Sequence, residues 1–268
     1  MISKKTLLKF EILLIVFVFY YNNIFPLFEI EGILGYGAEP SGMGGAYCAK
    51  ADSPFSIFYN PAGLYQYKNT SLFSEFASIA NIKNNNFITG VVINFQPYFS
   101  YSLAGYGLFN TENNFYESFL LSAVSVSFLD NESVSFLAGL NLKFLYAHYI
   151  NYASTVGADM GFLYRLKNLL YSKSINLGIF FKDIQTKIRW SNGMEEQLPF
   201  LIKIGVAYIG KEDFSLTTDM DIINYKIYTN NYRILFRYGI EKNFDFLVNK
   251  SCKIRGNIAI LSPAFKIG

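Results

Sequence analysis

Residues able to perform acid–base or nucleophilic chemistry are sparse in this sequence, and their spacing forms no catalytic set. The single histidine, His148, lies near the expected end of a strand, and the sequence places no serine or acid partner for it. Glu195 and Glu196 follow Gly193 in a polar stretch, which indicates a solvated turn rather than paired catalytic carboxylates. A calcium loop with paired aspartates, a glycine and a distal glutamate is also missing. The sequence therefore predicts a protein that is not an enzyme and that uses no metal or cofactor.

Opposite charges do recur on two neighbouring segments late in the chain. Asp219 and Asp221 share one face of an alternating segment, and Arg233 and Arg237 share one face of the next. If the turn between the segments centres near Ile227, Asp221 lies directly opposite Arg233. Directly opposed opposite charges contribute roughly 0.2–1 kcal/mol. These four residues predict a charged ladder on the inner face of a sheet.

Residues 35–64 lack alternation and form a different kind of element. Closely spaced glycines permit tight turns and a close approach of backbone to neighbouring walls; here they are Gly42, Gly44 and Gly45. Asn60 before Pro61 favours a helix start, because Asn accepts an N-cap hydrogen bond and Pro has a preset φ. We expect a short helix over 51–59 and a further turn over 61–64. A nucleotide-binding loop is excluded, since GxGxxG spacing and a Walker lysine are both missing.

The elements that position these residues are β-strands, because the chain alternates apolar and other residues beyond about residue 70. In residues 154–165 the apolar side chains fall on one face, and Gly157, Asp159 and Gly161 fall on the other. Many segments reach the roughly 9–11 residues that a tilted strand needs to cross a bilayer, whereas soluble strands average about 5–6. About eleven antiparallel strands are predicted in an all-β fold, at 70–80, 86–96, 99–110, 117–129, 133–147, 154–166, 173–183, 198–209, 212–223, 230–241 and 252–267.

Alternation alone does not tell which face of the sheet points inward. A soluble sandwich buries its apolar face, whereas an outer-membrane barrel turns that face to lipid. Two features favour the barrel. Glycines recur on the polar face, at Gly139, Gly157, Gly161, Gly178, Gly205 and Gly239, and aromatic residues lie near strand ends, at Tyr146, Tyr149, Tyr164 and Trp190. A crowded interior and an aromatic girdle explain both, while a soluble β architecture stays open as the alternative.

Composition narrows the class of protein further. Hydrophobic residues make up 51% of the 268 residues and charged residues 16%, against about 25% charged in ordinary soluble domains, so disorder is excluded. The net charge of +3, without a basic cluster beyond the first positions, argues against a nucleic-acid partner. Cys48 and Cys252 lie far apart without metal-ligand spacing, and we interpret both as small apolar fillers.

The chain begins like an export signal. Lysines precede an apolar run from Ile12 to Tyr21, which is shorter than the roughly 20 residues of a spanning helix. The predicted organisation is a signal-peptide-like segment over 1–30, a plug segment over 31–69, and barrel strands over 70–268.

Residues 42–64 also contain a recognisable signature. Its residues are Gly42, Met43, Gly44, Gly45, Ala46, Ala49, Ala51, Asp52, Asn60, Pro61, Ala62, Gly63 and Leu64. In order and spacing they resemble the PorV/PorQ family of outer-membrane proteins, which are relatives of the FadL-type (OMPP1/FadL/TodX) transporters of hydrophobic compounds. The chain is similar to the family again at residues 161–165, 188–190, 198–199, 205–208 and 253–256. Lys50 stands where the family prefers an apolar residue, and Lys182 where Asn is usual.

The resemblance implies a β-barrel of about fourteen strands in the outer membrane of a diderm bacterium, with residues 37–64 folded inside as a plug. The implied partners are outer-membrane lipid and either secreted protein clients or hydrophobic small molecules. Some family members are accessory components of type IX secretion that hold or shuttle clients, and this role is our leading hypothesis. The alternative is a FadL-like channel for long-chain fatty acids, and a third possibility is a soluble β-sandwich lipid binder.

Strand number leads to one more expectation. About eleven strands is an odd count, whereas bacterial single-chain barrels have even numbers. The sequence ends at Lys266–Gly268 inside an alternating stretch, so we expect two or three strands to be missing at the C-terminus. An unclosed barrel leaves unpaired backbone groups that each cost several kcal/mol in lipid. We therefore expect an open, strongly curved sheet, or a gap between strands 70–80 and 252–267.

Overall fold

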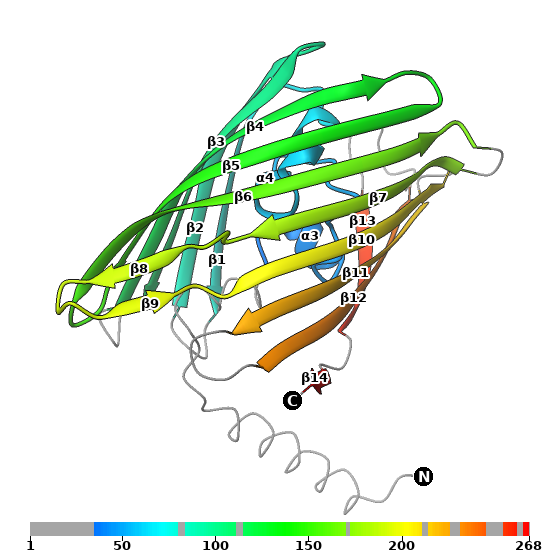
Figure 1. Ribbon diagram of the computed structural model, residues 1–268. Helices are drawn as coiled ribbons and strands as arrows, with labels where there is room; N and C mark the ends of the chain where they lie inside the picture. Colours follow the sequence, from blue (N-terminus) through cyan, green and yellow to red (C-terminus); the bar gives the residue numbers. More distant parts are fainter. Residues whose placement is uncertain are drawn as a thin grey trace, which may run out of the picture. The chain divides into compact units, whose positions relative to one another are not determined.

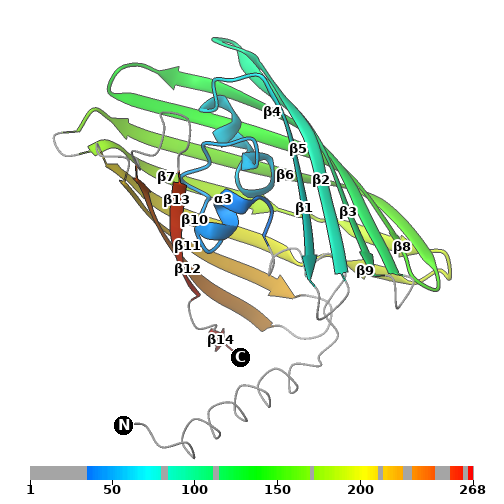
Figure 2. The same ribbon diagram turned by 180° about the vertical axis from the view of Figure 1, so that it is seen from behind.

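The computed structural model describes residues 35–79, 84–110, 115–169, 172–210, 214–225, 231–244, 254–261 and 265–267, all within one compact unit. The predicted signal-like segment 1–30 and Cys252 lie outside the described residues. The unit is an antiparallel sheet that curves around a short irregular segment, as seen from both sides (Figure 1, Figure 2). The all-β prediction is therefore confirmed.

Strands in the sheet follow one another in chain order. The main path is β1 (Ser71–Ile79), β2 (Asn84–Phe95), β3 (Phe99–Asn110), β4 (Phe115–Asp130), β5 (Val134–His148), β6 (Tyr152–Lys167), β7 (Ser172–Lys182), β10 (Phe200–Gly210), β11 (Phe214–Tyr225), β12 (Asn231–Phe244) and β13 (Ile254–Leu261). Eleven strands were predicted at these places. The path begins at β1 and ends at β13, and within the described ranges these two strands are not paired with each other.

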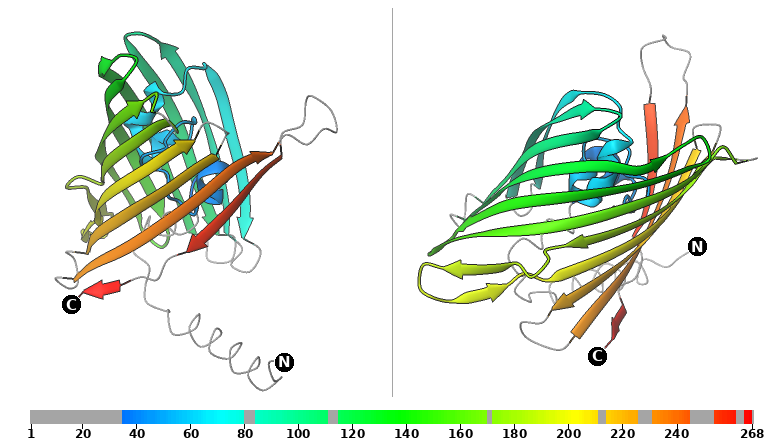
Figure 3. Two further views of the ribbon diagram at one scale, coloured as in Figure 1. Left: turned by 90° about the vertical axis from the view of Figure 1, so that its right-hand side faces the viewer. Right: turned by 45° about the horizontal axis from the view of Figure 1, so that its top comes forward.

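Three shorter strands lie off this path: β8 (Lys187–Trp190), β9 (Glu195–Gln197) and β14 (Phe265–Ile267). The β8–β9 hairpin was not predicted, and the interpretation of Glu195 and Glu196 as a turn was wrong because both belong to β9. Strands of four and three residues are too short for a period of two to stand out from the surrounding polar residues. Figure 3 shows the hairpin extending the wall of long strands.

The apolar face of the sheet points outward. In β5, Leu140, Leu142 and Phe144 are 49%, 56% and 51% exposed, whereas the intervening Asn141 and Lys143 are 0% and 4% exposed. The same inversion holds in β6, where Val156 is exposed and Asp159 is buried. A soluble sandwich has the opposite arrangement. The structure thus decides which face is inner, a question that the alternation left open.

Residues 35–66, called the inner segment below, lie on the concave face of the sheet (Figure 3). They contain α3 (Ala38–Gly42), α4 (Ser56–Tyr59) and the 3₁₀ helix η1 (Pro61–Tyr65). Asn60 caps η1 by accepting a hydrogen bond from the Ala62 N–H at 3.1 Å, and Pro61 follows it, as the sequence predicted. Helix α3 was not predicted.

The predicted helix over 51–59 is confined to its last turn. Pro54 disfavours helical backbone in the preceding residue, and Ala51 has a left-handed φ of 34°, so α4 begins only at Ser56. Apolar contacts join the inner segment to the sheet through Ala62, Tyr65, Leu137 and Leu163, and through the stacked and edge-on rings of Tyr36, Phe58, Tyr106 and Phe119.

Candidate functional site

The candidate functional site is the contact surface between the inner segment and the concave face of the sheet. Glycines on neighbouring strands let the two backbones touch. A Cβ atom at Gly161 of β6 would lie 2.1 Å from the Asn60 Oδ1, and one at Gly139 of β5 would lie 2.3 Å from the Ala62 backbone nitrogen. Gly139 and Gly161 are directly opposite in the β5–β6 register. The band continues at Gly178, Gly205 and Gly239, which meet Cys48, Asp219 and Met43.

Asn60 joins three parts of this surface. Its side chain is completely buried, and its Nδ2 donates to the Cys48 carbonyl at 2.9 Å and to the Phe162 carbonyl of β6 at 3.0 Å. Its Oδ1 accepts the capping bond from Ala62. The Asn60 side-chain amide therefore provides hydrogen-bond partners for three backbone groups: the Ala62 N–H at the start of η1, the Cys48 carbonyl and the Phe162 carbonyl.

Other side chains of the sheet donate to carbonyls of the inner segment. Ser125 Oγ of β4 donates to the Ala62 carbonyl at 2.8 Å, and Asn141 Nδ2 of β5 donates to the Ile57 carbonyl at 2.8 Å. Asn176 Nδ2 of β7 donates to the Ala49 carbonyl at 3.1 Å. Because the inner segment has little regular structure, its buried backbone groups depend on such partners.

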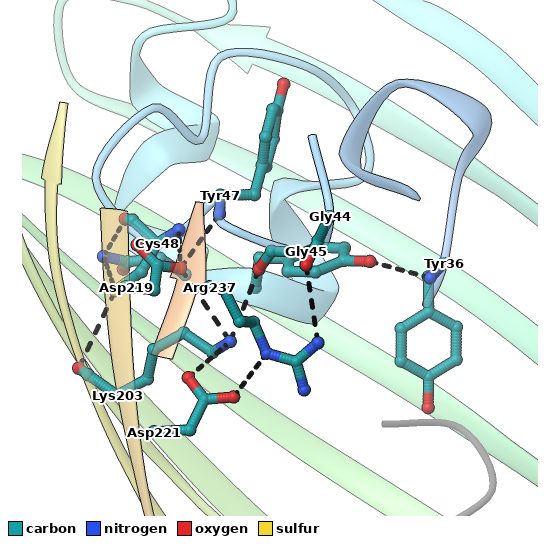
Figure 4. Close-up of polar contacts among 11 residues, drawn as sticks. Tyr36, Gly44, Gly45, Tyr47, Cys48, Lys203, Asp219, Asp221 and Arg237 are labelled. Atoms are coloured by element: carbon teal, nitrogen blue, oxygen red, sulfur yellow. Dashed lines mark hydrogen bonds and ion pairs between the residues drawn. The ribbon is translucent and has the colours of Figure 1, made fainter. Parts of the chain in front are cut away.

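Asp219, Asp221 and Arg237 of the predicted charged ladder do come together, joined by Lys203, and this cluster also holds the inner segment (Figure 4). Asp219 Oδ2 of β11 accepts hydrogen bonds from the backbone N–H groups of Tyr47 and Cys48, both at 2.9 Å. Asp221 Oδ1 pairs with Lys203 Nζ of β10 at 2.8 Å, and its Oδ2 pairs with Arg237 Nε of β12 at 2.7 Å.

The two cations of this ladder also reach the inner segment. Arg237 Nη1 approaches the Gly44 carbonyl, and Lys203 Nζ approaches the Gly45 carbonyl, both at 3.5 Å (Figure 4). A Cβ atom at Gly45 would lie 3.0 Å from Arg237 Nη1. The sequence did not single out Lys203, although it lies opposite Asp221 in the β10–β11 register.

The predicted register of the ladder was wrong. Strands β11 and β12 pair about residue 228, so Arg233 lies opposite Ile223 and Asp221 lies opposite Leu235. The predicted turn centre at Ile227 placed every partner two residues away. A slip of two residues keeps each side chain on its face, so alternation cannot detect it. Arg237, opposite Asp219, is the arginine that binds Asp221.

Lys50 lies in a cage of three carboxylates, although it is only 4% exposed. Its Nζ is 2.7 Å from Glu39, 2.8 Å from Asp52 and 3.1 Å from Glu241 of β12. Burial lowers the pKa of Lys50, but the three carboxylates outweigh burial and raise the pKa above its ordinary value. Asp52 also accepts a hydrogen bond from the Tyr47 hydroxyl at 2.6 Å.

The remaining signature residues lie within the inner segment. Gly42 ends α3, Met43 is fully buried, and Gly44 and Gly45 have φ values of 62° and 73°, which favour glycine. A Cβ atom at Gly63 would lie 2.1 Å from the Ala51 carbonyl oxygen. The other members, Ala46, Ala62 and Leu64, are completely buried.

Cys48 packs in the same surface as a buried thiol. Its Sγ is 3.8 Å from the Lys203 carbonyl oxygen, and Asp219 binds its backbone N–H. Burial, followed by the nearby Asp219 carboxylate, raises the pKa of the Cys48 thiol well above its ordinary value. Its burial and raised pKa are in keeping with a packing role.

A second buried ion cluster was missed in the sequence. Lys143 Nζ of β5 is 2.6 Å from Asp159 Oδ1 of β6 and also pairs with Asp183 Oδ1. The Asp183 N–H donates to Asp159 Oδ1 at 2.8 Å. Lys143 and Asp159 each interrupt the small residues on the inner faces of adjacent strands, and this signal could have identified the pair. His148, by contrast, is exposed at the end of β5.

Within the described ranges, no group of three His, Cys, Asp or Glu side chains is arranged to hold a metal ion. None of the described helices is both long and apolar enough to cross a bilayer. Comparison of the chain with protein-family models, curated proteins and solved structures finds no match.

Proposed function

We propose that this chain is an outer-membrane β-barrel protein of the PorV/PorQ type, exported by its N-terminal signal and acting without chemistry to hold or pass a protein client. The observation that carries the proposal is the inverted polarity of the sheet, with large apolar side chains exposed outside and charged ones buried inside. A lipid-facing exterior and a polar interior are typical of such barrels.

The width of the apolar surface supports a bilayer location. On the outer face, β5 is apolar from Phe136 to Phe144, and β6 is apolar from Val156 to Tyr164. Each run spans nine residues, close to the roughly 9–11 residues of a tilted transmembrane strand. Tyr146 and Tyr152 follow at one boundary, where aromatic residues favour the interface between lipid and water.

The lining of the concave face favours the client-holding role over a channel for hydrophobic molecules. Where the inner segment lies, the sheet presents apolar side chains such as Leu137 and Leu163, and also asparagine, serine, aspartate, lysine and arginine side chains that bind the inner segment. A fatty-acid site is expected to be mostly apolar, with few polar groups. The residues 37–64 then act as a plug held by the wall.

A matched pair of outward substitutions tests the membrane location. Leu140→Lys lies in the middle of the apolar run of β5, where a lysine on the lipid face costs about 2–4 kcal/mol. Tyr152→Lys lies beyond the run, where the cost is about 0–1 kcal/mol. We expect Leu140→Lys to abolish heat-modifiable migration and recovery in detergent-extracted outer membrane, and Tyr152→Lys to preserve both. Equal tolerance of both variants, or a folded monomer in the soluble periplasm, would contradict the barrel.

The client-holding role is tested separately. Deletion of the gene in its native host should reduce the secreted proteins in the medium and accumulate them in the periplasm. Proteoliposomes that contain the full chain should take up a labelled long-chain fatty acid no faster than empty vesicles. Fast uptake with unchanged secretion would support the FadL-like channel instead.

A further inference from the structure

The first strand of the sheet has one free edge. Strand β1 pairs along its whole length with β2, from Ser71 opposite Val92 to Ile79 opposite Asn84. On its other side, β1 pairs with no strand of the described residues. A free edge presents backbone N–H and carbonyl groups that template another strand, and such groups are costly when they stay unsatisfied in lipid. The free side of β1 is therefore a site for strand addition.

Strand direction restricts what can pair there. All neighbours along the main path are antiparallel, and this path contains eleven strands within the described ranges. Its two end strands, β1 and β13, therefore run in the same direction. Direct pairing of β1 with β13 would be parallel, unlike every other pair of the path. A strand that runs antiparallel to β1 also runs antiparallel to β13, so the edge favours an added antiparallel strand.

The outward side chains of β1 lack a neighbour on the free side. Leu72 and Phe76 are 84% and 66% exposed, whereas Leu140, Leu142 and Phe144 of the central strand β5 are 49%, 56% and 51% exposed. Side chains of adjacent strands cover one another across a sheet, and β5 has such neighbours on both sides. The outer face of an added strand would therefore be apolar, to match Leu72 and Phe76.

The inward side of β1 is held by the inner segment. The rings of Phe73 and Phe55 meet edge-on with their centroids 5.2 Å apart. The Glu75 carboxylate interacts with the backbone N–H groups of Gly37 and Ala38. Helix α3 also contacts β13, and Figure 2 shows the inner segment between β1 and β13. The edge is thus preorganised, because β1 is already extended and fixed before another strand arrives.

One carboxylate oxygen on this inward side has no partner. Glu75 Oε2 is buried and accepts no hydrogen bond within the described ranges. Glu75 is the central residue of the nine-residue strand β1. Residues directly opposite in an antiparallel pair share one face, so a cationic residue at the centre of an added strand would point toward Glu75 and donate to it. The other inward positions of that strand would be small, because the inner segment occupies this side.

We propose that the free edge of β1 binds an extended segment of a client protein as an additional antiparallel strand. This segment has apolar residues on its outward face and a lysine or arginine opposite Glu75. Backbone hydrogen bonds provide affinity in strand addition, and the alternating side chains provide specificity. The inference rests on the client-holding function proposed above, for which it names the recognition site and the chemistry that is recognised.

The test uses the purified full chain in detergent and a fluorescent peptide of the sequence Ser-Val-Ser-Val-Lys-Val-Ser-Val-Ser. In the antiparallel register its lysine lies opposite Glu75, and its valines share the outer face with Leu72 and Phe76. Two further peptides carry glutamine or glutamate in place of the lysine. Glu75→Gln removes the charge but keeps an acceptor oxygen. Glu132→Gln, in an exposed turn, is the matched control.

We expect the wild type to bind the lysine peptide about tenfold more tightly than the glutamine peptide, because the lysine makes a charge-assisted hydrogen bond. The glutamate peptide should bind more weakly than either. Glu75→Gln should bind the lysine and glutamine peptides equally, and Glu132→Gln should keep the tenfold preference. No binding of the lysine peptide, or a preference that persists in Glu75→Gln, would overturn the proposal. A dimer of the chain that excludes the peptide would assign the edge to a second copy and would overturn it too.

Peptide binding and secretion are measured separately, so the two proposals can fail separately. Impaired secretion in the deletion strain together with no peptide binding would remove β1 as the client site and leave the client-holding function in place. Unchanged secretion in the deletion strain would contradict the client-holding function itself.

Discussion

The sheet holds the inner segment in two different ways on its two sides. Strands β4 to β7 present neutral donors, and Ser125, Asn141 and Asn176 bind backbone carbonyls. Strands β10 to β12 present charges, and Asp219 binds backbone N–H groups. An irregular segment in a buried site exposes both kinds of backbone group. The neutral side satisfies carbonyls, whereas the charged side satisfies N–H groups through Asp219 and also approaches the Gly44 and Gly45 carbonyls through Arg237 and Lys203.

The difference predicts how each side responds to substitution. On the neutral side, the backbones touch at glycines and leave no room for a Cβ atom. Steric clashes and the loss of buried hydrogen bonds therefore decide how much a substitution destabilises the fold. On the charged side, each carboxylate has more than one partner, so the loss of a single contact is shared.

The largest expected effect is steric and lies on the neutral side. Gly161→Ala places a Cβ atom 2.1 Å from Asn60 Oδ1 and 2.9 Å from Pro61 Cδ, and we expect a loss of at least about 3 kcal/mol in the free energy of unfolding. Gly105→Ala on β3 is the control, since a Cβ atom there has nothing within 4 Å. Unfolding in urea measures both variants. If the two variants were equally stable, the close backbone contact at Gly161 would not be what limits substitution there.

The second effect tests the charged side at Lys50. Lys50→Met leaves three carboxylates without their cation and should cost roughly 3 kcal/mol at neutral pH. Lys68→Met, on an exposed lysine, should cost less than about 0.5 kcal/mol.

The pH dependence of the Lys50 contribution follows from the sign of its pKa shift. The pKa of Lys50 is raised in the folded chain, so its stabilisation is fully present below the unfolded-state pKa of about 10.4. It is lost as the pH rises through the folded-state value. The stability gap between the wild type and Lys50→Met should therefore narrow above about pH 10.4. If the stability difference between the wild type and Lys50→Met widened above that pH, the pKa of Lys50 would be lowered on folding rather than raised.

A smaller effect is expected at Asn60. Asn60→Ala removes the cap of η1 and leaves the Cys48 and Phe162 carbonyls without this donor, at a cost of about 2 kcal/mol. The control is Asn192→Ala, where the side chain accepts only a bond from the Met194 N–H in an exposed turn. Equal losses in the two variants would argue against a special role of Asn60.

The smallest effect is expected at Asp219. In Asp219→Asn the amide oxygen still accepts from Tyr47 and Cys48, and Lys203 keeps Asp221, so the cost should be about 1 kcal/mol. Urea unfolding of Asp219→Asn and Asn60→Ala under the same conditions compares the loss of stability on the charged side with that on the neutral side. A larger loss in Asp219→Asn would show that the charged side is the less tolerant of the two.

Several features follow from the sequence by local physics. Alternation places a side chain on one face or the other, and it located the eleven main strands and the small, polar face that meets the inner segment. The Asn60–Pro61 cap was predicted because capping depends only on neighbouring residues. Alternation also placed Asp219, Asp221, Arg233 and Arg237 on one ladder, of which Asp221 and Arg237 pair directly.

Other features depend on which segments meet, and only the tertiary structure decided them. A register slip of two residues preserves every face, so alternation could not tell that the β12 partner of Asp221 is Arg237, which lies opposite Asp219. The cage of Lys50 gathers Glu39, Asp52 and Glu241 from distant parts of the chain. The outward direction of the apolar face was also decided by the tertiary structure. A period of two separates the two faces of a strand but does not say which face points inward, so this depends on what the sheet encloses.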